Sequence, residues 1–268
     1  MNRYMQKTDT FFIIHNFNTV PEYLLEYCKD YMIFDASTDE KVRKQLIEKN
    51  LNHVSIENTG HNITTYFQYF ADNYESLPEV MCLCKGNMID RHCSKEFFDR
   101  VYENTYFTFL FEEKHMKNKE ALISENKYLE ENNDWYVQSP SHPRRYFDSY
   151  NQLLKFIYKN PILPKYTLFS PGACFIVRRE QVLKHSKEFY LNLNKIMNYE
   201  LNPNFPSEAH QVERMLPEIF CGNYEVNPWM NSEMEFEQKL PKEIRKVENN
   251  RALEGKRFKK IRRLFQWK

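Results

Sequence analysis

Short apolar runs alternate with amphipathic stretches through the first half of the chain. Runs such as Val80–Cys84 have the length and composition of buried strands. Asn62–Tyr74 instead places its apolar side chains at helical spacing. This alternation predicts strands at Thr10–Ile14, Tyr31–Phe34, His53–Ile56, Val80–Cys84 and Tyr106–Phe111, and helices at Glu22–Lys29, Lys41–Lys49, Asn62–Tyr74 and Ser94–Tyr102.

The second half of the chain is more helical. Ser37 and Glu40 have the spacing of a capping box, so Ser37 is expected to cap the helix Lys41–Lys49. Ser207 is expected to cap a later helix in the same way. We also expect a polar helix and loop over Lys114–Asn133, a strand at Ala173–Val177, and helices at Asp148–Lys159, Glu180–His185, Phe189–Tyr199 and Glu208–Phe220.

Strands joined by helices through short connections predict an α/β fold, with a mainly parallel central sheet and helices on both faces. We expect one α/β domain over residues 1–230 and a basic, helical C-terminal extension over 231–268. Ligands of parallel sheets bind at the carboxyl ends of the strands. That rule selects the loops His15–Asn18, Asp35–Ser37, Glu57–Asn62 and Lys85–Arg91.

Composition narrows the class of protein. The chain is 41% hydrophobic with a net charge of +1, a balance that does not suit a protein that coats nucleic acid. No apolar run approaches the roughly 20 residues of a membrane span, and Met1–Thr10 lacks the core of a signal peptide. The six cysteines are scattered, which favours reduced thiols. We therefore expect a cytoplasmic protein.

Glycine is rare, with only 5 residues, so each one marks a backbone requirement. Gly60 lies between a strand and a helix, and Gly86 directly follows a strand. Both positions allow a backbone to approach a ligand closely, although a plain tight turn has the same pattern. No GxGxxG or GxxxxGK[ST] sequence supports a dinucleotide or P-loop site.

Several segments occur in an order that is found in a known family. They are the turn Glu57–Asn62, Asn73–Pro78, Lys85–Asn87, Phe169–Glu180 and the pair Glu213–Arg214. In this order the chain resembles a poorly characterised family of glycosyltransferase-like proteins of bacterial polysaccharide clusters and fungi. His61–Asn62 and Lys85 stand where that family usually has Arg-Glu and Gln.

The resemblance implies a GT-A-like (Rossmann-like) fold and a glycosyltransferase. Its substrates would be a nucleotide-sugar donor and a surface-polysaccharide or lipid-linked glycan acceptor. The nucleotide-sugar site would then lie along the selected loops. Its expected members are His15, Asn16, Asp35, Asn58, Gly60, His61, Asn62, Lys85, Gly86, Asn87, Arg91, Arg144, Arg145 and Gly172.

Charge on the leaving diphosphate must be neutralised during such a transfer. Many GT-A enzymes hold a divalent metal with Asp-x-Asp, but here Lys85-Gly86-Asn87 follows the strand. Asp90 alone makes a poor site for a hard metal ion. We expect cations to replace the metal, with Lys85, Arg91, Arg144 and Arg145 as candidates, although the two adjacent arginines are also typical of a solvated loop.

An acceptor hydroxyl must also lose its proton, usually to a carboxylate. In the resembling family an acidic residue lies in the late helix, which makes Glu213 the first candidate and leaves Glu208 and His210 as alternatives. A surface carboxylate paired with Arg214 is the structural alternative. Gly172-Ala173 would let the acceptor loop pass close to the donor, or form a simple turn into a strand.

The C-terminal tail is strongly basic. Arg251–Lys268 has eight Lys and Arg against Glu254, a formal charge of +7, so the rest of the chain carries −6. Phe258, Ile261 and Phe265 share one helical face, as in helices that lie on anionic lipid. This predicts a peripheral protein on the inner face of the plasma membrane; a helix packed on the domain, or a contact between subunits of an oligomer, is the alternative.

Two other functions fit the same sequence. One is a different nucleotide-dependent group transferase, which would usually need acidic metal ligands. The other is a binding module with a degenerate transferase fold, in which His61-Asn62 and Lys85 mark lost chemistry. The pattern of residues identifies neither the donor nor the acceptor.

Overall fold

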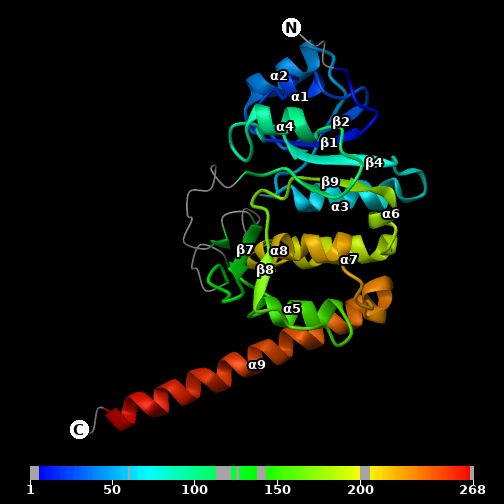
Figure 1. The fold of residues 1–268 in the computed structure, drawn as a ribbon. Helices are drawn as coiled ribbons and strands as arrows, with labels where there is room; N and C mark the ends of the chain where they lie inside the picture. Colours follow the sequence, from blue (N-terminus) through cyan, green and yellow to red (C-terminus); the bar gives the residue numbers. More distant parts are fainter. Residues whose placement is uncertain are drawn as a thin grey trace.

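The computed structural model describes residues 6–59, 61–112, 122–124, 127–137, 143–199 and 206–265, without the side chains of 122–124, 127–128 and 254–265. A six-stranded sheet forms its centre, with the order β3-β2-β1-β4-β9-β5 (Figure 1). β1, β2, β3 and β4 are parallel, and β9 is antiparallel to both of its neighbours. The strands are β1 (Phe11–Asn16), β2 (Tyr31–Asp35), β3 (His53–Ser55), β4 (Val80–Lys85), β5 (Thr108–Phe109) and β9 (Phe175–Arg178).

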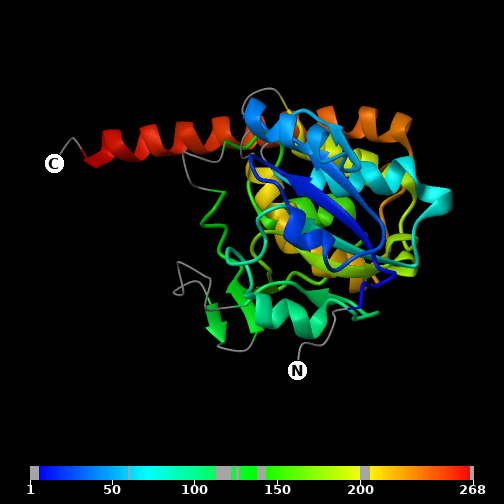
Figure 2. The same ribbon diagram turned by 90° about the horizontal axis from the view of Figure 1, so that it is seen from above.

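Helices cover both faces of this sheet, as predicted. Side chains alternate along each strand, so Phe12 and Ile14 enter one core and Ile13 and Leu83 enter the other. The first core is closed by α1 (Glu22–Leu25), α2 (Glu40–Glu48) and α4 (Lys95–Val101). The second is closed by α3 (Ile63–Asp72), followed by α7 (Lys187–Met197) and α8 (Ser207–Cys221) (Figures 1 and 2).

A second, three-stranded antiparallel sheet lies beside α8. It consists of β6 (Leu122–Ser124), β7 (Lys127–Glu131) and β8 (Tyr166–Leu168), with β7 in the middle. The expectation of a helix within Lys114–Asn133 is therefore wrong where the chain is described. The segment is polar, and strand pairing with the distant β8 overrides its local preference.

Two expected helix caps are also wrong. Asp39, not Ser37, accepts a hydrogen bond from the N–H of Lys41 at the start of α2. Ser37 instead bonds to Asp35 and to the N–H of Asn18, which ties together the loops after β1 and β2. Ser207 is the first residue of α8, and its hydroxyl has no hydrogen-bond partner among the residues that the structure describes. The helix expected at Ser94–Tyr102 is confirmed as α4, and Ser94 caps it by accepting a hydrogen bond from the N–H of Phe97.

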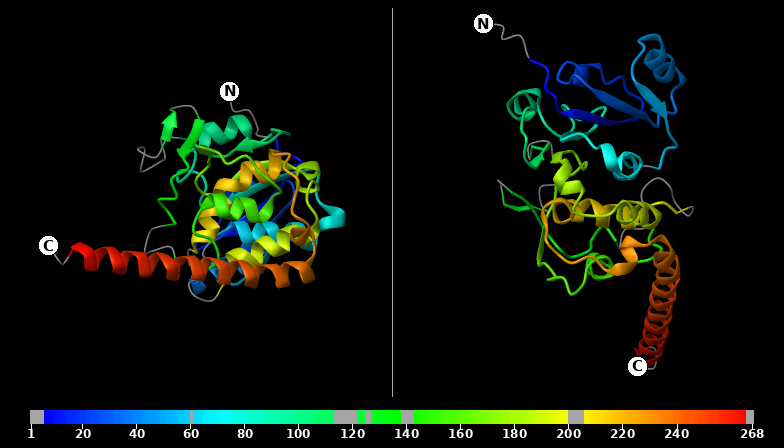
Figure 3. Two further views of the ribbon diagram at one scale, coloured as in Figure 1. Left: turned by 90° about the horizontal axis from the view of Figure 1, so that it is seen from below. Right: turned by 90° about the vertical axis from the view of Figure 1, so that its right-hand side faces the viewer.

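The remaining helices form the far end of the molecule. α5 (Tyr150–Ile157) lies beyond α7 and α8, and α9 (Glu233–Phe265) packs there through Phe236, Leu240 and Val247 before it projects away from the body (Figure 3). No helix in the described parts of the chain is long and apolar enough to cross a membrane. Short helical turns complete this fold: η1 (Tyr74–Ser76), α6 (Arg179–Val182) and η4 (Pro228–Asn231).

Candidate functional site

The strand order reverses between β1 and β4. The chain continues from β1 to β2 on one side, whereas β4 lies on the other side of β1. At such a reversal the loops leaving the two strands diverge and open a crevice, where open α/β sheets bind their ligands. The residues at the carboxyl ends of β1 and β4 are therefore the first place to look for a site.

Five residues selected from the sequence meet at this edge, on the α3 side of the sheet. His15 and Lys85 are partners in adjacent strands, so their side chains share that face. His61 precedes α3, and His210 and Glu213 lie about one turn apart on α8. His61 is close enough to the other four to be influenced electrostatically by each of them. We call these five residues the edge cluster.

The two histidines nearest the strands are held uncharged. Burial, with Lys85 nearby, lowers the pKa of His15 to about 4, and its Nδ1 lies 2.9 Å from Thr65 Oγ1. Burial, followed by the charges of His15 and His210, lowers the pKa of His61 to about 3. Both ring nitrogens of His61 are buried without a hydrogen-bond partner in the described structure. At neutral pH these imidazoles are therefore neutral groups that can still donate and accept hydrogen bonds.

Glu213 carries the negative charge of the cluster. Burial alone would raise its pKa, but His210, together with Arg214 and Lys85, outweighs that effect and lowers the pKa to about 2. One carboxylate oxygen accepts a hydrogen bond from the Gly172 N–H at 2.8 Å, and the other lies 3.8 Å from His210 Nδ1. The carboxylate is therefore ionised and fixed in place at neutral pH.

The loop before β9 is clamped between α3 and α8. Glu213 holds the N–H of Gly172, and the Asn62 side chain donates to the carbonyls of Gly172 at 2.9 Å and Ala173 at 3.3 Å. Gly172 has a φ of +93°, and a Cβ there would lie 2.5 Å from Cε1 of His92. Only glycine fits this position. The loop runs along the same edge of the sheet as the edge cluster.

A second polar group lies at the same edge but on the α1 side of the sheet. The Asn16 amide donates to Asp35 Oδ1 at 2.8 Å and accepts from Thr19 Oγ1 at 2.6 Å. A Cβ on Gly86 would lie 2.3 Å from Asn16 Oδ1, so a backbone without a side chain is required there. Asp35 is fully buried and binds the loops after β1 and β2 together, which is a structural role.

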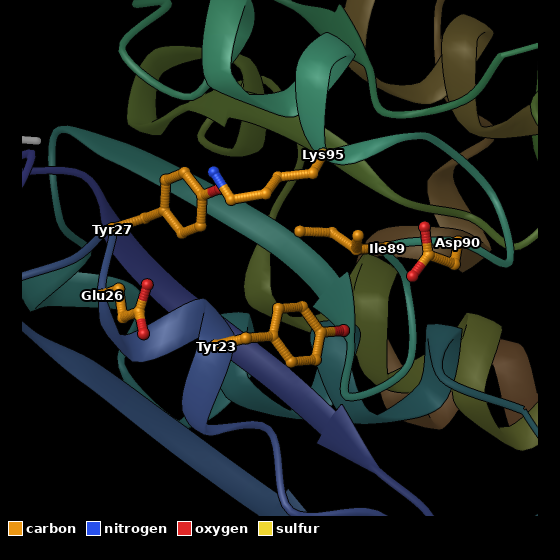
Figure 4. Close-up of a pocket in the computed structure, with 6 residues that line it drawn as sticks. All are labelled: Tyr23, Glu26, Tyr27, Ile89, Asp90 and Lys95. Atoms are coloured by element: carbon orange, nitrogen blue, oxygen red, sulfur yellow. The ribbon is translucent and has the colours of Figure 1, made fainter. Parts of the chain in front are cut away.

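A cavity of about 350 Å³ opens on that α1 side (Figure 4). Its volume is within the range of small-ligand sites. Tyr23 donates a hydrogen bond to the Gly86 carbonyl, so the cavity shares the loop after β4 with the crevice. The carboxylates of Glu26 and Asp90 line it and make it unsuitable for a diphosphate. The lining residues are Tyr23, Glu26, Tyr27, Ile89, Asp90 and Lys95.

Three selected residues lie away from the edge cluster and have structural partners. Glu208 is fully buried, and it accepts hydrogen bonds from the backbone N–H groups of Arg145, Tyr146 and Phe147 and from the Tyr199 hydroxyl. Arg144 pairs with Asp148 at 2.8 Å. Arg145 lies over the rings of Tyr146 and Tyr199. These contacts hold the segment before α5, so none of the three is placed to act on a ligand at the crevice.

The other selected positions surround the crevice more loosely. Asn58 and Asn87 are half-buried, and Arg91 is exposed on the turn after β4. Gly60 lies outside the described residues. Within the described part of the chain, no three His, Cys, Asp or Glu side chains are grouped closely enough to hold a metal ion. All six cysteines are free thiols.

Three features at the site are not evident in the sequence. Thr65 contacts His15, and His92 lies against Gly172, although the two members of each pair come from distant segments. Arg214 and Glu130 form an ion pair whose side chains are only 3% and 2% exposed. The guanidinium group lies between the rings of Tyr136 and Phe169, at 3.9 and 4.1 Å from their centroids. Helical spacing places Arg214 beside the buried face of α8, but nothing in the sequence indicates its partner on β7.

Comparison with known proteins corrects the resemblance described above. No curated protein and no solved structure matches the chain. A family model matches residues 23–234, which is most of the chain, and it does not describe a glycosyltransferase family. The assignment to a glycosyltransferase-like family is therefore wrong: the ordered motifs carrying it are short and individually common. The chain belongs to the family described as "Protein of unknown function (DUF3431)".

Proposed function

We propose that the crevice between β1 and β4 binds the diphosphate of a nucleotide sugar and that the protein is a glycosyltransferase. One observation carries this proposal: a lysine, two neutral histidines and a carboxylate–histidine pair converge where the strand order reverses. Such a transfer needs a group to neutralise the leaving diphosphate and a base for the acceptor hydroxyl. The edge cluster offers both on one face of the sheet.

Lys85 is the group that neutralises the diphosphate. It is half-buried at the end of β4, on the same face of the sheet as His15. His15 and His61 flank Lys85 as neutral imidazoles. They can donate hydrogen bonds to phosphate oxygens, and they add no positive charge that would repel the Lys85 ammonium group. Arg91, exposed on the same loop, is the second cation within this segment. In this arrangement the finer fold assignment is a GT-A-like sheet with a cation at the position of the usual metal site.

His210 is the proposed base, with Glu213 holding it. Glu213 already accepts a hydrogen bond from the Gly172 N–H, and the positive charges of Arg214 and Lys85 favour its ionised form, which argues against Glu213 as the proton acceptor. Glu213 is better suited to orient His210, 3.8 Å away, and to stabilise the imidazolium that forms. The acceptor O–H proton moves to His210, the acceptor oxygen bonds to the anomeric carbon, and the sugar–phosphate bond breaks as the diphosphate leaves.

Substitution of His210 and Glu213 separates these two roles. His210→Gln should lower kcat about 10²- to 10⁴-fold, the usual contribution of a general base. Glu213→Gln keeps an oxygen for the Gly172 N–H, so it should lower kcat by less than His210→Gln does. If Glu213→Gln loses most of the activity while His210→Gln turns over normally, the roles are reversed.

The direct test is a thermal-shift screen of the purified protein against UDP-, GDP-, CMP- and TDP-sugars, followed by assays of hydrolysis and transfer. Stabilisation by one nucleotide sugar, with turnover, is the expected result. Lys85→Met should remove the stabilisation, whereas Lys44→Ala, an exposed lysine on α2, should preserve it. No shift with any nucleotide sugar would contradict the proposal and favour the binding module. A shift without sugar release would favour another nucleotide-dependent transferase.

A further inference from the structure

The loop between α5 and β8 has an unusual sequence, Lys159-Asn160-Pro161-Ile162-Leu163-Pro164-Lys165. Two apolar residues stand between two prolines, and the prolines stand between two lysines. Ile162 is 75% exposed and Leu163 is 40% exposed. We call the segment Lys159–Lys165 the proline loop.

The proline loop is held firmly at both ends. The N–H of Lys159 donates to the Glu225 carbonyl at 2.8 Å, and the carbonyl of Lys165 accepts from the N–H of Asn132 at 3.0 Å. The Asn132 side chain also donates to the Pro164 carbonyl, at 2.8 Å. Each proline fixes its own φ. The apolar pair is thus presented to solvent by an ordered backbone.

A groove of about 710 Å³ runs beside this loop. Trp229 lines it, and the ammonium group of Lys239 on α9 lies 4.3 Å from the centre of the Trp229 ring. On the other flank, Tyr166 is partly exposed beneath Lys165. Tryptophan and tyrosine at the margin of an apolar surface are typical of the water–lipid interface.

Lysines stand on both sides of the proline loop, and of the carboxylates at the start of α9, Glu233 and Glu237 pair with Lys195. Lys155 and Lys165 form no ion pair with any residue that the structure describes, and Lys159 pairs with Glu225. α5 and the start of α9 lie at the same end of the molecule, away from α1 and α2 (Figure 1). α9 leads from there to the tail, whose formal charge is +7. Lysines attract this end toward anionic lipid, and the exposed isoleucine and leucine can enter the headgroup boundary.

We propose that this end of the protein docks on an anionic membrane surface, with Ile162 and Leu163 inserted and Lys155 and Lys165 over the headgroups. The surface is separate from the edge cluster and does not depend on the reaction proposed above. A single weak anchor gives only marginal membrane binding, so the loop supplies a contact additional to the tail.

Fluorescence of a tryptophan at the loop tip tests insertion whatever the tail contributes. The tryptophan emission of Ile162→Trp in the full chain should shift to the blue on vesicles of equal phosphatidylcholine and phosphatidylglycerol. Brominated acyl chains in these vesicles should quench that emission. Ile47→Trp is the matched control, since Ile47 on α2 is 65% exposed at the opposite end, and its added fluorescence should do neither. Equal behaviour of the two variants would overturn the proposal.

Affinity gives the second measurement. The double variant Ile162→Ser with Leu163→Ser should bind these vesicles at least about tenfold more weakly, because two apolar side chains no longer leave water. Ile47→Ser with Leu183→Ser should bind normally. Pure phosphatidylcholine should bind all forms weakly. Unchanged affinity of the loop variant, or a change from dimer to monomer without any effect on vesicle binding, would show that the loop meets protein instead of lipid.

Discussion

Replacing Glu130 with glutamine should destabilise the protein by about 3 kcal/mol, because it removes one member of a buried ion pair. Both oxygens of Glu130 accept hydrogen bonds from Arg214, and one also accepts from the Trp135 indole at 2.9 Å. Glutamine offers a single oxygen. At least one N–H of Arg214 then loses its acceptor, and the guanidinium group between the two aromatic rings is left with the more distant Glu213, at 4.0 Å, as a counter-charge.

The assay is thermal unfolding followed by circular dichroism. A loss of about 3 kcal/mol corresponds to a fall in Tm of roughly 6–12 °C for a domain of this size. Glu131→Gln is the control, since Glu131 is the next residue of β7 and is exposed. The double variant with Arg214→Met should be less unstable than the sum of the two single variants, because each partner depends on the other. The reasoning would be refuted if Glu130→Gln were as stable as the control and if the stability losses of the two single variants simply added in the double variant.

Two further outcomes concern the edge cluster and the loop before β9. The pKa of His61 is about 3 in the folded protein and about 6.5 in the unfolded chain. Between these pH values the unfolded state binds more protons than the folded state. The free energy of unfolding should therefore fall as the pH drops from 6.5 toward 3. His61→Gln should flatten that part of the Tm–pH curve, and a slope as steep as in the wild type would contradict the assignment. Gly172→Ala should destabilise the protein by at least about 1–3 kcal/mol through backbone strain, and by more through contact with His92, as measured by urea unfolding. An alanine variant of full stability would show that the loop relaxes easily.

The hydrophobic pattern predicts the central fold well, because the parallel strands and their helices are defined by local periodicity. Val80–Cys84 is apolar throughout, and it is the core of β4. The small sheet is missed, because β7 is polar and its pairing with β8 joins segments far apart in the chain. Ser37 is mistaken for a cap because its spacing allows two local bonds, and only the fold shows that Asp35 takes its hydroxyl.

The candidate site is predictable in part. The strand-end rule selects His15, His61 and Lys85, since parallel strands bring their carboxyl ends to one edge. It does not tell a carboxylate that anchors a turn, such as Glu208, from one at the crevice, such as Glu213. Both lie on α8, and their roles depend on which backbone N–H groups reach them. Those groups come from segments that the helical pattern does not connect.

The clamped backbone at Gly172 has a consequence for motion. Its N–H is bonded to a side chain of α8 and its carbonyl to a side chain at the N-terminus of α3, so this one residue joins two helices. The amide hydrogen can exchange with solvent only when that junction opens. The exchange rate of this single hydrogen therefore reports how often the crevice opens, and a ligand that bridges Lys85 and His210 should slow it.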